Sequence, residues 1–138
     1  MTINELSKYH SAKIEIDQLE NNIRELESTI IGASKITGMP IIKSNSTSNP
    51  TERIGIKLVR LKNKLEVKKE LLIDVLNKIE DFLETVEDSE IRVIIRERFI
   101  DGKTWQEISR KIISDRSTPY YKLKKYLKER MLSDENKK

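Results

Sequence analysis

Residues 101–130 read DGKTWQEISRKIISDRSTPYYKLKKYLKER, and the predicted fold of the C-terminal part follows from them. Thr104 and Glu107 have the spacing of a capping box, in which the hydroxyl and the carboxylate each accept a hydrogen bond from a backbone amide at the helix start. The motif predicts a short helix that begins near Trp105. Residues 114–118 are a second run of capping side chains, so a longer helix is predicted to follow to about Met131. Two helices joined in this way form a helix-turn-helix.

The last helix has two unlike faces. At about 100° per residue, the predicted packing face collects Pro119, Leu123, Tyr126, Leu127 and Arg130. The other face is polar and basic and consists of Ser117, Thr118, Tyr121, Lys124, Lys125 and Lys128. Residues 116–130 hold six cations against the single acid Glu129, a local charge of +5. Such a helix suits a major groove, with its first turn at base edges and its lysines at phosphates, so the pattern predicts a double-stranded DNA partner.

Each predicted DNA contact follows from its position. The residues expected at base edges are Ser117, Thr118 and Tyr121, and those expected at phosphates are Lys103, Arg110, Arg116, Lys122, Lys124, Lys125 and Lys128. The start of the helix stays open. With Asp115 as the N-cap, Pro119 lies late in the first turn; with Thr118 as the N-cap, Pro119 takes the first helical position, where proline is favoured. The two registers shift which side chains reach the bases.

Residues 89–130 also resemble a known family. The run EIRVIIRERFIDGKTWQEISRKI, followed by SDRSTPYYKLKKYL, is similar to the fourth region of bacterial sigma factors, a helix-turn-helix that reads the upstream promoter hexamer. It resembles still more the small sigma-region-four-like regulators of phages and prophages of Gram-positive bacteria, the ArpU, LtrC and RinA type. The resemblance implies a helical N-terminal half and activation of phage late genes. Pro119 departs from the pattern, because such helices usually carry a small or branched apolar residue there.

Composition limits the classes of function. The 138 residues include no cysteine and one histidine, His10, which excludes thiolate and histidine-rich metal sites. Motifs for phosphate loops, nucleophiles and metals are missing, so neither an enzyme nor a cofactor is expected. Residues 1–10 contain charges and no long apolar run, which predicts no signal peptide and no membrane span and favours the cytoplasm of a bacterial host cell.

Charge is unevenly distributed along the chain. Residues 1–31 carry three cations and six acids, a balance of −3, whereas residues 88–132 carry twelve cations and seven acids, a balance of +5. This asymmetry favours an anionic partner for the C-terminal end and a different role for the N-terminal half.

A heptad pattern predicts a long first helix. Thr2 and Glu5 form another capping box, and apolar residues then recur at steps of three and four: Tyr9, Ala12, Ile16, Leu19, Ile23, Leu26 and Ile30. Gly32 is predicted to end this helix. The loop 32–49 has an apolar part at residues 36–42, which either binds a partner or folds back over the helices; the second interpretation is favoured. Its polar part has the composition of a flexible linker.

A second long helix is predicted over residues 51–87. Asn49, Pro50 and Glu52 provide its start signals. Its seam consists of Ile54, Leu58, Leu61, Leu65, Lys68, Leu72, Val75, Ile79, Phe82 and Val86. Two heptad helices joined by a loop are expected to pair antiparallel with coiled-coil packing, and Lys68 would help to set their register.

More apolar residues lie off this seam than a two-helix pair buries: Val59, Val67, Leu71, Ile73, Leu76 and Leu83. We expect a second copy of the chain to cover them, because two helix-turn-helix units together recognise a symmetric DNA site. The alternatives are that host RNA polymerase covers them or that the C-terminal part folds back over them.

In the C-terminal part, a helix over residues 88–100 is predicted to pack through Ile91, Ile94, Ile95 and Phe99. Trp105 is expected to pack on Phe99 rather than on DNA.

The sequence therefore predicts an all-α chain. A long antiparallel helical hairpin over residues 1–87 serves dimerisation or partner contact, residues 88–132 form a sigma-region-four-like helix-turn-helix DNA-binding domain, and residues 133–138 form a disordered tail. The predicted function is sequence-specific transcriptional regulation, which the resemblance narrows to activation of phage late genes. Two alternatives stay open: a small terminase subunit, and a phage protein that inhibits a host protein through its hairpin.

Overall fold

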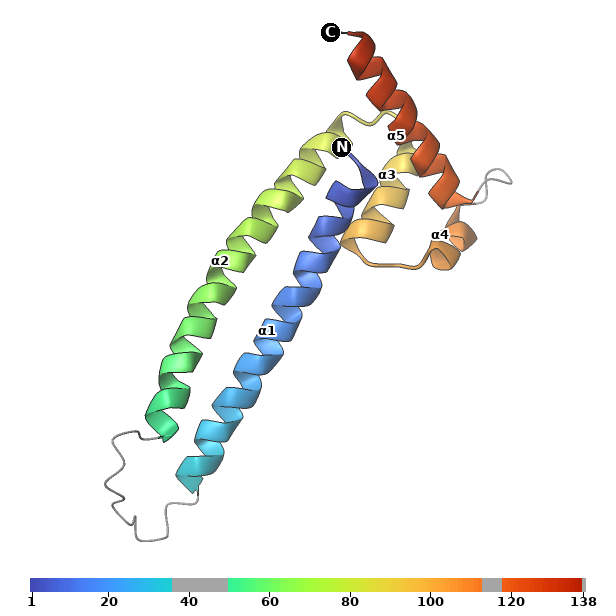
Figure 1. Cartoon of the computed structure of the whole chain (residues 1–138). Coiled ribbons are helices and arrows are strands. Elements are labelled where there is room, and N and C mark those ends of the chain that lie inside the picture. The colour runs from blue at the N-terminus through green and yellow to red at the C-terminus, as the bar shows by residue number, and fades with distance from the viewer. Residues whose placement is uncertain (36–49, 113–117, 138) are drawn as a thin grey trace. The chain divides into compact units, whose positions relative to one another are not determined.

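The computed structural model describes residues 1–35, 50–112 and 118–137, and every regular element in these ranges is a helix (Figure 1). The elements are α1 (Ile3–Lys35), α2 (Pro50–Glu84), α3 (Ser89–Ile95), a π-helical turn η1 (Arg96–Ile100), α4 (Trp105–Lys111) and α5 (Pro119–Asn136). The predicted all-α class is confirmed.

The chain forms two compact units that do not divide at the expected boundary between residues 87 and 88. One unit combines Met1–Ala12 with Leu72–Lys138, and the other is Lys13–Leu71. The first unit thus takes the beginning of α1 and the end of α2 together with all of the later helices. We call it the α3–α5 unit, and we call the other the long-helix unit.

Helix α1 begins as predicted and ends later than predicted. The Thr2 amide donates to Glu5 Oε2 at 2.7 Å and the Glu5 amide donates to Thr2 Oγ1 at 3.2 Å, so the capping box forms. Gly32 does not end the helix, which continues through Lys35. A single glycine costs a helix only about 1 kcal/mol relative to alanine, which is too little to stop a long one. The expected apolar segment 36–42 lies outside the described residues.

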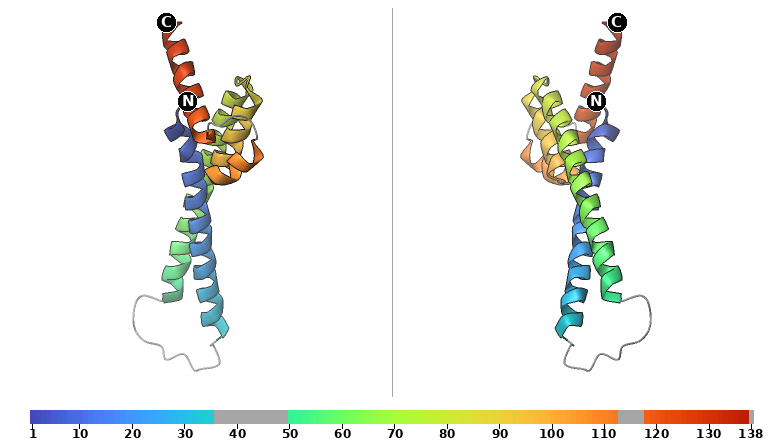
Figure 2. Two further views of the ribbon diagram at one scale, coloured as in Figure 1. Left: turned by 90° about the vertical axis from the view of Figure 1, so that its right-hand side faces the viewer. Right: turned by 90° about the vertical axis from the view of Figure 1, so that its left-hand side faces the viewer.

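In the long-helix unit, α1 and α2 lie side by side and run in opposite directions (Figure 2). Three ion pairs join them: Glu15 to Lys68 at 3.2 Å, Glu20 to Lys69 at 3.2 Å, and Glu27 to Lys62 at 2.8 Å. Between the helices, the predicted seam residues Ile16, Ile23 and Leu65 are buried. Lys68, the polar residue of the seam, therefore faces a carboxylate of the neighbouring helix.

Helix α2 ends at Glu84, three residues before the predicted end. The amides of Thr85 and Val86 donate to the carbonyls three residues earlier, at 3.0 and 3.1 Å, which tightens the last turn. Asp88 then caps α3, since its carboxylate accepts from the amide of Glu90 at 2.9 Å and from that of Ile91 at 3.5 Å. The predicted start signal Asn49 lies outside the described residues, and Pro50 is the first helical residue.

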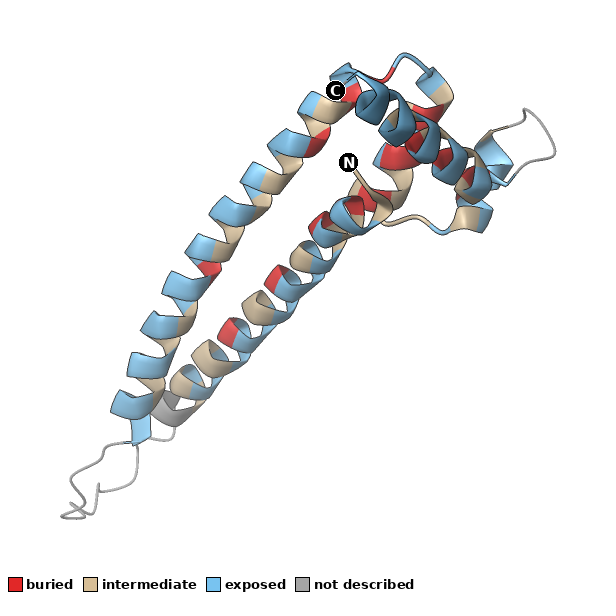
Figure 3. Cartoon of the chain, turned by 45° about the horizontal axis from the view of Figure 1, so that its top comes forward, coloured by how far each residue is buried: buried red, intermediate tan, exposed pale blue. Residues whose placement is uncertain are grey.

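The α3–α5 unit has a core built from distant parts of the chain. Its buried members are Leu6 and Tyr9 of α1, Ile79, Leu83 and Val86 at the end of α2, and Ile91, Ile94, Ile95, Phe99, Ile108, Leu123 and Leu127 from the later helices (Figure 3). Leu83 is only 1% exposed and Leu76 packs against the same core. The expectation that a second copy covers these two leucines was wrong, because the chain covers them itself.

The predicted helix over residues 88–100 is α3 followed by the π-helical turn η1. At the end of that turn, the Asp101 amide donates to the Arg96 carbonyl at 2.9 Å, and the amide of Lys103, three residues beyond η1, donates to the Glu97 carbonyl at 2.9 Å. Gly102 follows with φ of +74°, a left-handed conformation in which other residues are strained. This turn reverses the chain so that α4 packs back on η1 and α5.

Candidate nucleic-acid interface

The capping box of α4 forms as predicted. The Glu107 amide donates to Thr104 Oγ1 at 3.2 Å, and the Thr104 amide donates to Glu107 Oε2 at 2.8 Å. The hydrogen bond from the Thr104 amide favours the charged carboxylate and holds the pKa of Glu107 below its ordinary value. The first turn of α4 is therefore held at a defined residue, and Ile108 is buried one turn later.

Trp105 packs on Phe99 within the unit, as predicted. Its ring meets Phe99 edge-on at 6.3 Å between centroids and meets Tyr120 of α5 at 5.4 Å. The guanidinium of Arg98 lies 4.9 Å from the centre of the indole ring and also donates to the Lys103 carbonyl at 2.9 Å. These contacts fix the angle between α4 and the beginning of α5.

Helix α5 begins at Pro119, which decides between the two registers. Thr118 occupies the N-cap position with extended backbone, and Pro119 takes the first helical position. The alternative cap Asp115 and two of the predicted DNA contacts, Arg116 and Ser117, lie outside the described residues.

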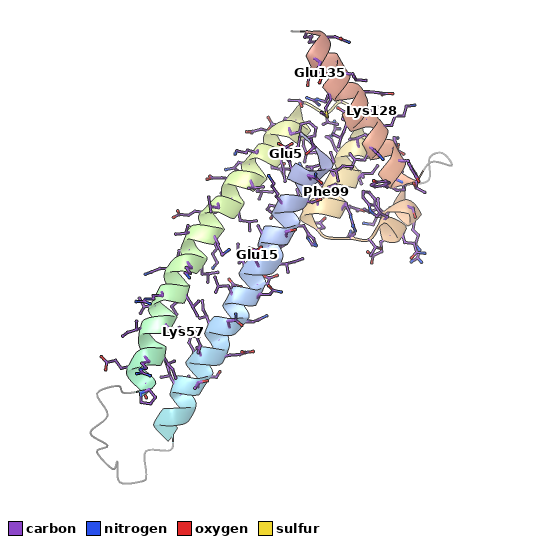
Figure 4. All side chains as sticks on the ribbon, viewed as in Figure 1. Glu5, Glu15, Lys57, Phe99, Lys128 and Glu135 are labelled. Carbon is purple, nitrogen blue, oxygen red and sulfur yellow. The ribbon has the colours of Figure 1, made fainter. Side chains whose placement is uncertain are left out.

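The two faces of α5 are divided as predicted. Pro119, Leu123 and Leu127 are buried, and the half-buried Arg130 stacks on Phe82, with its guanidinium 4.7 Å from the ring centre. On the opposite side the exposed predicted contacts are Thr118, Tyr121, Lys124, Lys125 and Lys128. Figure 4 labels Lys128, whose side chain projects outward from α5.

Helix α5 runs further than expected. It continues to Asn136, so residues 133–136, which we assigned to a disordered tail, are helical. They lengthen an exposed part of the helix on which Met131 and Leu132 are 48% and 52% exposed.

Two predicted phosphate contacts have acidic neighbours outside their own helix or turn, and Lys125 lies 4.0 Å from Glu129 within α5. Lys122 forms an ion pair with Glu90 and lies 3.9 Å from Asp88, both at the start of α3. Lys103 lies 3.4 Å from Glu97 of η1. Arg110, in contrast, is exposed near the end of α4. The basic residues that the sequence grouped together thus separate into exposed cations and cations that hold the helices together.

Sequence reasoning missed the ion pairs that surround η1. Glu97, whose side chain is 12% exposed, accepts from Lys111 Nζ at 2.6 Å as well as from Lys103. The bond from Lys111 is the largest cause that lowers the pKa of Glu97 and also raises the pKa of Lys111. Arg96 and Glu80 form a two-bonded pair at 2.7 Å, which raises the pKa of Arg96. No short-range spacing in the sequence signals pairs that join separate helices.

A pocket of about 380 Å³ lies beside the exposed face of α5. Its lining includes Tyr121, Lys125 and Glu129 of α5, Ile91 of α3 and Asp88, the N-cap of α3. Acids and lysines both line it, so the pocket has mixed charge even though Tyr121 and Lys125 of the exposed face belong to its lining.

Among the residues with described positions, no group of three or more His, Cys, Asp or Glu is placed to hold a metal ion. No helix in the same residues combines the length and apolar character that crossing a membrane requires. A scan of protein-family models and searches of curated proteins and of solved structures found no match to this chain.

Proposed function

We propose that α4 and α5 form a helix-turn-helix and that the chain is a sequence-specific, double-stranded DNA-binding transcriptional regulator. The observation that carries this proposal is the exposed face of α5, which begins at an N-cap threonine and continues through Tyr121, Lys124, Lys125 and Lys128, while the opposite face is buried. In this proposal α1 and α2 are an antiparallel hairpin with coiled-coil packing that serves as the partner-binding arm.

The chemistry of that face suits the major groove. Thr118 at the helix start and Tyr121, which is 64% exposed, offer hydroxyl groups and an aromatic edge to the bases. Lys124, Lys125 and Lys128 come one to two turns later, where a helix lying in the groove meets the phosphates that border it. The single charge on each lysine attracts any phosphate, so these residues supply affinity and the first turn supplies sequence preference.

The ion pairs of the unit separate the predicted phosphate contacts into two groups. We assign Lys124, Lys125, Lys128 and Arg110 to phosphates, because they are exposed. We assign Lys122 and Lys103 to the stability of the unit, because each has an acidic partner on another element. The step from DNA binding to activation of phage late genes rests on the resemblance to sigma-region-four-like regulators.

The experiment that tests this function is a mobility-shift titration of the full chain against intergenic DNA of the phage that encodes it, with unrelated competitor DNA at physiological salt. Saturable, sequence-selective binding supports the regulator. Binding that the competitor removes without preference contradicts sequence-specific regulation. If the chain binds no DNA at all, the favoured function becomes inhibition of a host protein through the long helices.

The exposed cations also predict how strongly the affinity for DNA depends on salt concentration. Four neutralised phosphates give a slope of about −4 when log affinity is plotted against log salt concentration, and Lys124→Ala should flatten this slope by about one. Lys122→Ala is the matched control: two positions away on the same helix, it should leave the slope unchanged and lower the thermal unfolding midpoint. Equal slopes for the wild type and Lys124→Ala would remove Lys124 from the phosphate contacts.

A further inference from the structure

The outer side of α2 carries an ordered charge pattern that the proposed DNA contact does not use. Arg53, Arg60, Val67, Asp74 and Asp81 follow one another at intervals of seven residues within this helix, so they form one line along it, which we call the α2 stripe. All five side chains are exposed, Val67 to 57%.

The stripe faces away from α1. Leu65 is buried in the seam and precedes Val67 by two positions, which corresponds to about 200° around the helix. Exposed residues follow the side of α2 that is turned away from α1 (Figure 3). The stripe is therefore the surface of α2 that intramolecular packing leaves open.

The sign of the charge reverses at Val67. The two arginines of the stripe precede Val67 by 14 and 7 residues, and the two aspartates follow it by 7 and 14 residues. Beside the stripe, the cation Lys64 likewise precedes Val67 by three residues and the acid Glu70 follows it by three. Reversing the direction of the helix therefore replaces every charge of the stripe by its opposite. A surface with this property is complementary to itself in an antiparallel arrangement.

Two charges of the stripe have a like charge one turn away on the same helix. Like charges four residues apart, as in Arg60 with Lys64 and in Glu70 with Asp74, destabilise a lone helix. Within the described parts of the chain, none of the ion pairs involves Arg53, Arg60, Asp74 or Asp81. The ion pairs between α1 and α2 use other residues of α2, which lie off the stripe.

We propose that the α2 stripe is a self-association surface on which a second copy of the chain packs its α2 antiparallel, with the twofold axis at Val67. This symmetry places Arg60 of each copy opposite Asp74 of the other and Arg53 opposite Asp81. A parallel pair would instead place like charges together. Ile56, Val59 and Leu71, which are 51%, 60% and 58% exposed, flank the stripe and lose contact with water in the pair. The surface is independent of DNA binding.

The position of the axis is tested by disulfide formation. The chain has no cysteine, so Val67→Cys introduces one thiol per copy, and the twofold axis brings the two thiols together. Mild oxidation should convert Val67→Cys into a covalent dimer on a denaturing gel. Ile56→Cys is the matched control on the same side of the helix, because the antiparallel arrangement places its two copies about 33 Å apart along the axis. Equal dimer yields from the two variants would overturn the proposal.

The charge pairing is tested by reversal in the cysteine-free chain, with the dimer dissociation constant measured by sedimentation equilibrium. Arg60→Glu and Asp74→Arg should each raise this constant about tenfold, because each substitution acts twice in a twofold dimer, and the combined variant should restore it. Glu25→Arg, an exposed reversal on α1, should have no effect.

A wild-type chain that stays monomeric at every concentration would overturn the proposal and leave the stripe to a different protein. Single reversals that dimerise as tightly as the wild type, or a combined variant that is not restored, would also overturn it. Circular dichroism of each variant, which should match the wild type because the substituted positions are exposed, separates loss of pairing from loss of folding.

Discussion

At the residue scale, Gly102 holds the turn that leads from η1 to α4. Its φ is +74°, and a β-carbon added there would lie 2.5 Å from Cε1 of His10 on α1. We expect Gly102→Ala to lower the free energy of unfolding by about 1–2 kcal/mol from backbone strain alone, and by more because the imidazole must move. In a His10→Ala background only the backbone part should remain. Urea unfolding of the wild type, the two single variants and the double variant measures the backbone part and the imidazole part of the loss. If Gly102→Ala lowers the free energy of unfolding equally with and without His10, the contact with the imidazole is contradicted.

Glu97 should make stability depend on acid pH. Its hydrogen bond from Lys111, with a second from Lys103, lowers its folded-state pKa below the ordinary value of 4.5. The unfolded chain therefore binds the proton more tightly, so the stabilisation is fully present above pH 4.5 and is lost as the pH falls through the folded-state pKa. Thermal unfolding between pH 7 and pH 3 should show this loss. Glu97→Gln should lower the free energy of unfolding by roughly 1 kcal/mol at pH 7 and make stability depend less on acid pH. The control Glu66→Gln, at an exposed position, should lose stability in acid as the wild type does.

At the element scale, α4 has one strong start signal and is only seven residues long. We expect Thr104→Ala to cost about 1 kcal/mol of folding stability, because the Glu107 amide loses its acceptor at the first turn. The thermal midpoint measures this cost. Ser109→Ala, an exposed change in the same helix, should move the midpoint much less, and equal shifts for both variants would show that the cap does not hold α4.

At the scale of the whole molecule, the N-terminal residues belong to the unit that carries α4 and α5. Leu6 is fully buried in the same core as Ile108 and Leu123. Leu6→Ala should therefore lower the stability of this unit by about 2–5 kcal/mol. Hydrogen exchange should show faster opening of α3, α4 and α5, although the substitution is in α1. Asn4→Ala, at an exposed neighbouring position, serves as the control, and unchanged protection of the later helices would contradict this coupling.

Features that depend on neighbours within about one helical turn could be predicted from the sequence. Both capping boxes, the buried seam positions of α1 and α2, and the two faces of α5 follow from hydrogen bonds and periodicity along one helix. Periodicity alone therefore predicts the outward direction of Tyr121, Lys124 and Lys128.

The residues that share a core and the charges that are paired could not be predicted in this way, because they depend on contacts between separate helices. Leu6 and Leu83, more than 70 residues apart in the sequence, belong to one core, and Lys122, which the sequence grouped with the outer lysines as a phosphate contact, is paired with Glu90. The end of α2 also has a partner on another element, because Arg130 of α5 donates to the Thr85 carbonyl at 3.4 Å. Local patterns carry no information about contacts between distant residues. A helix has the same periodicity whether its face is exposed to water, packs on another helix or contacts a carboxylate of another element.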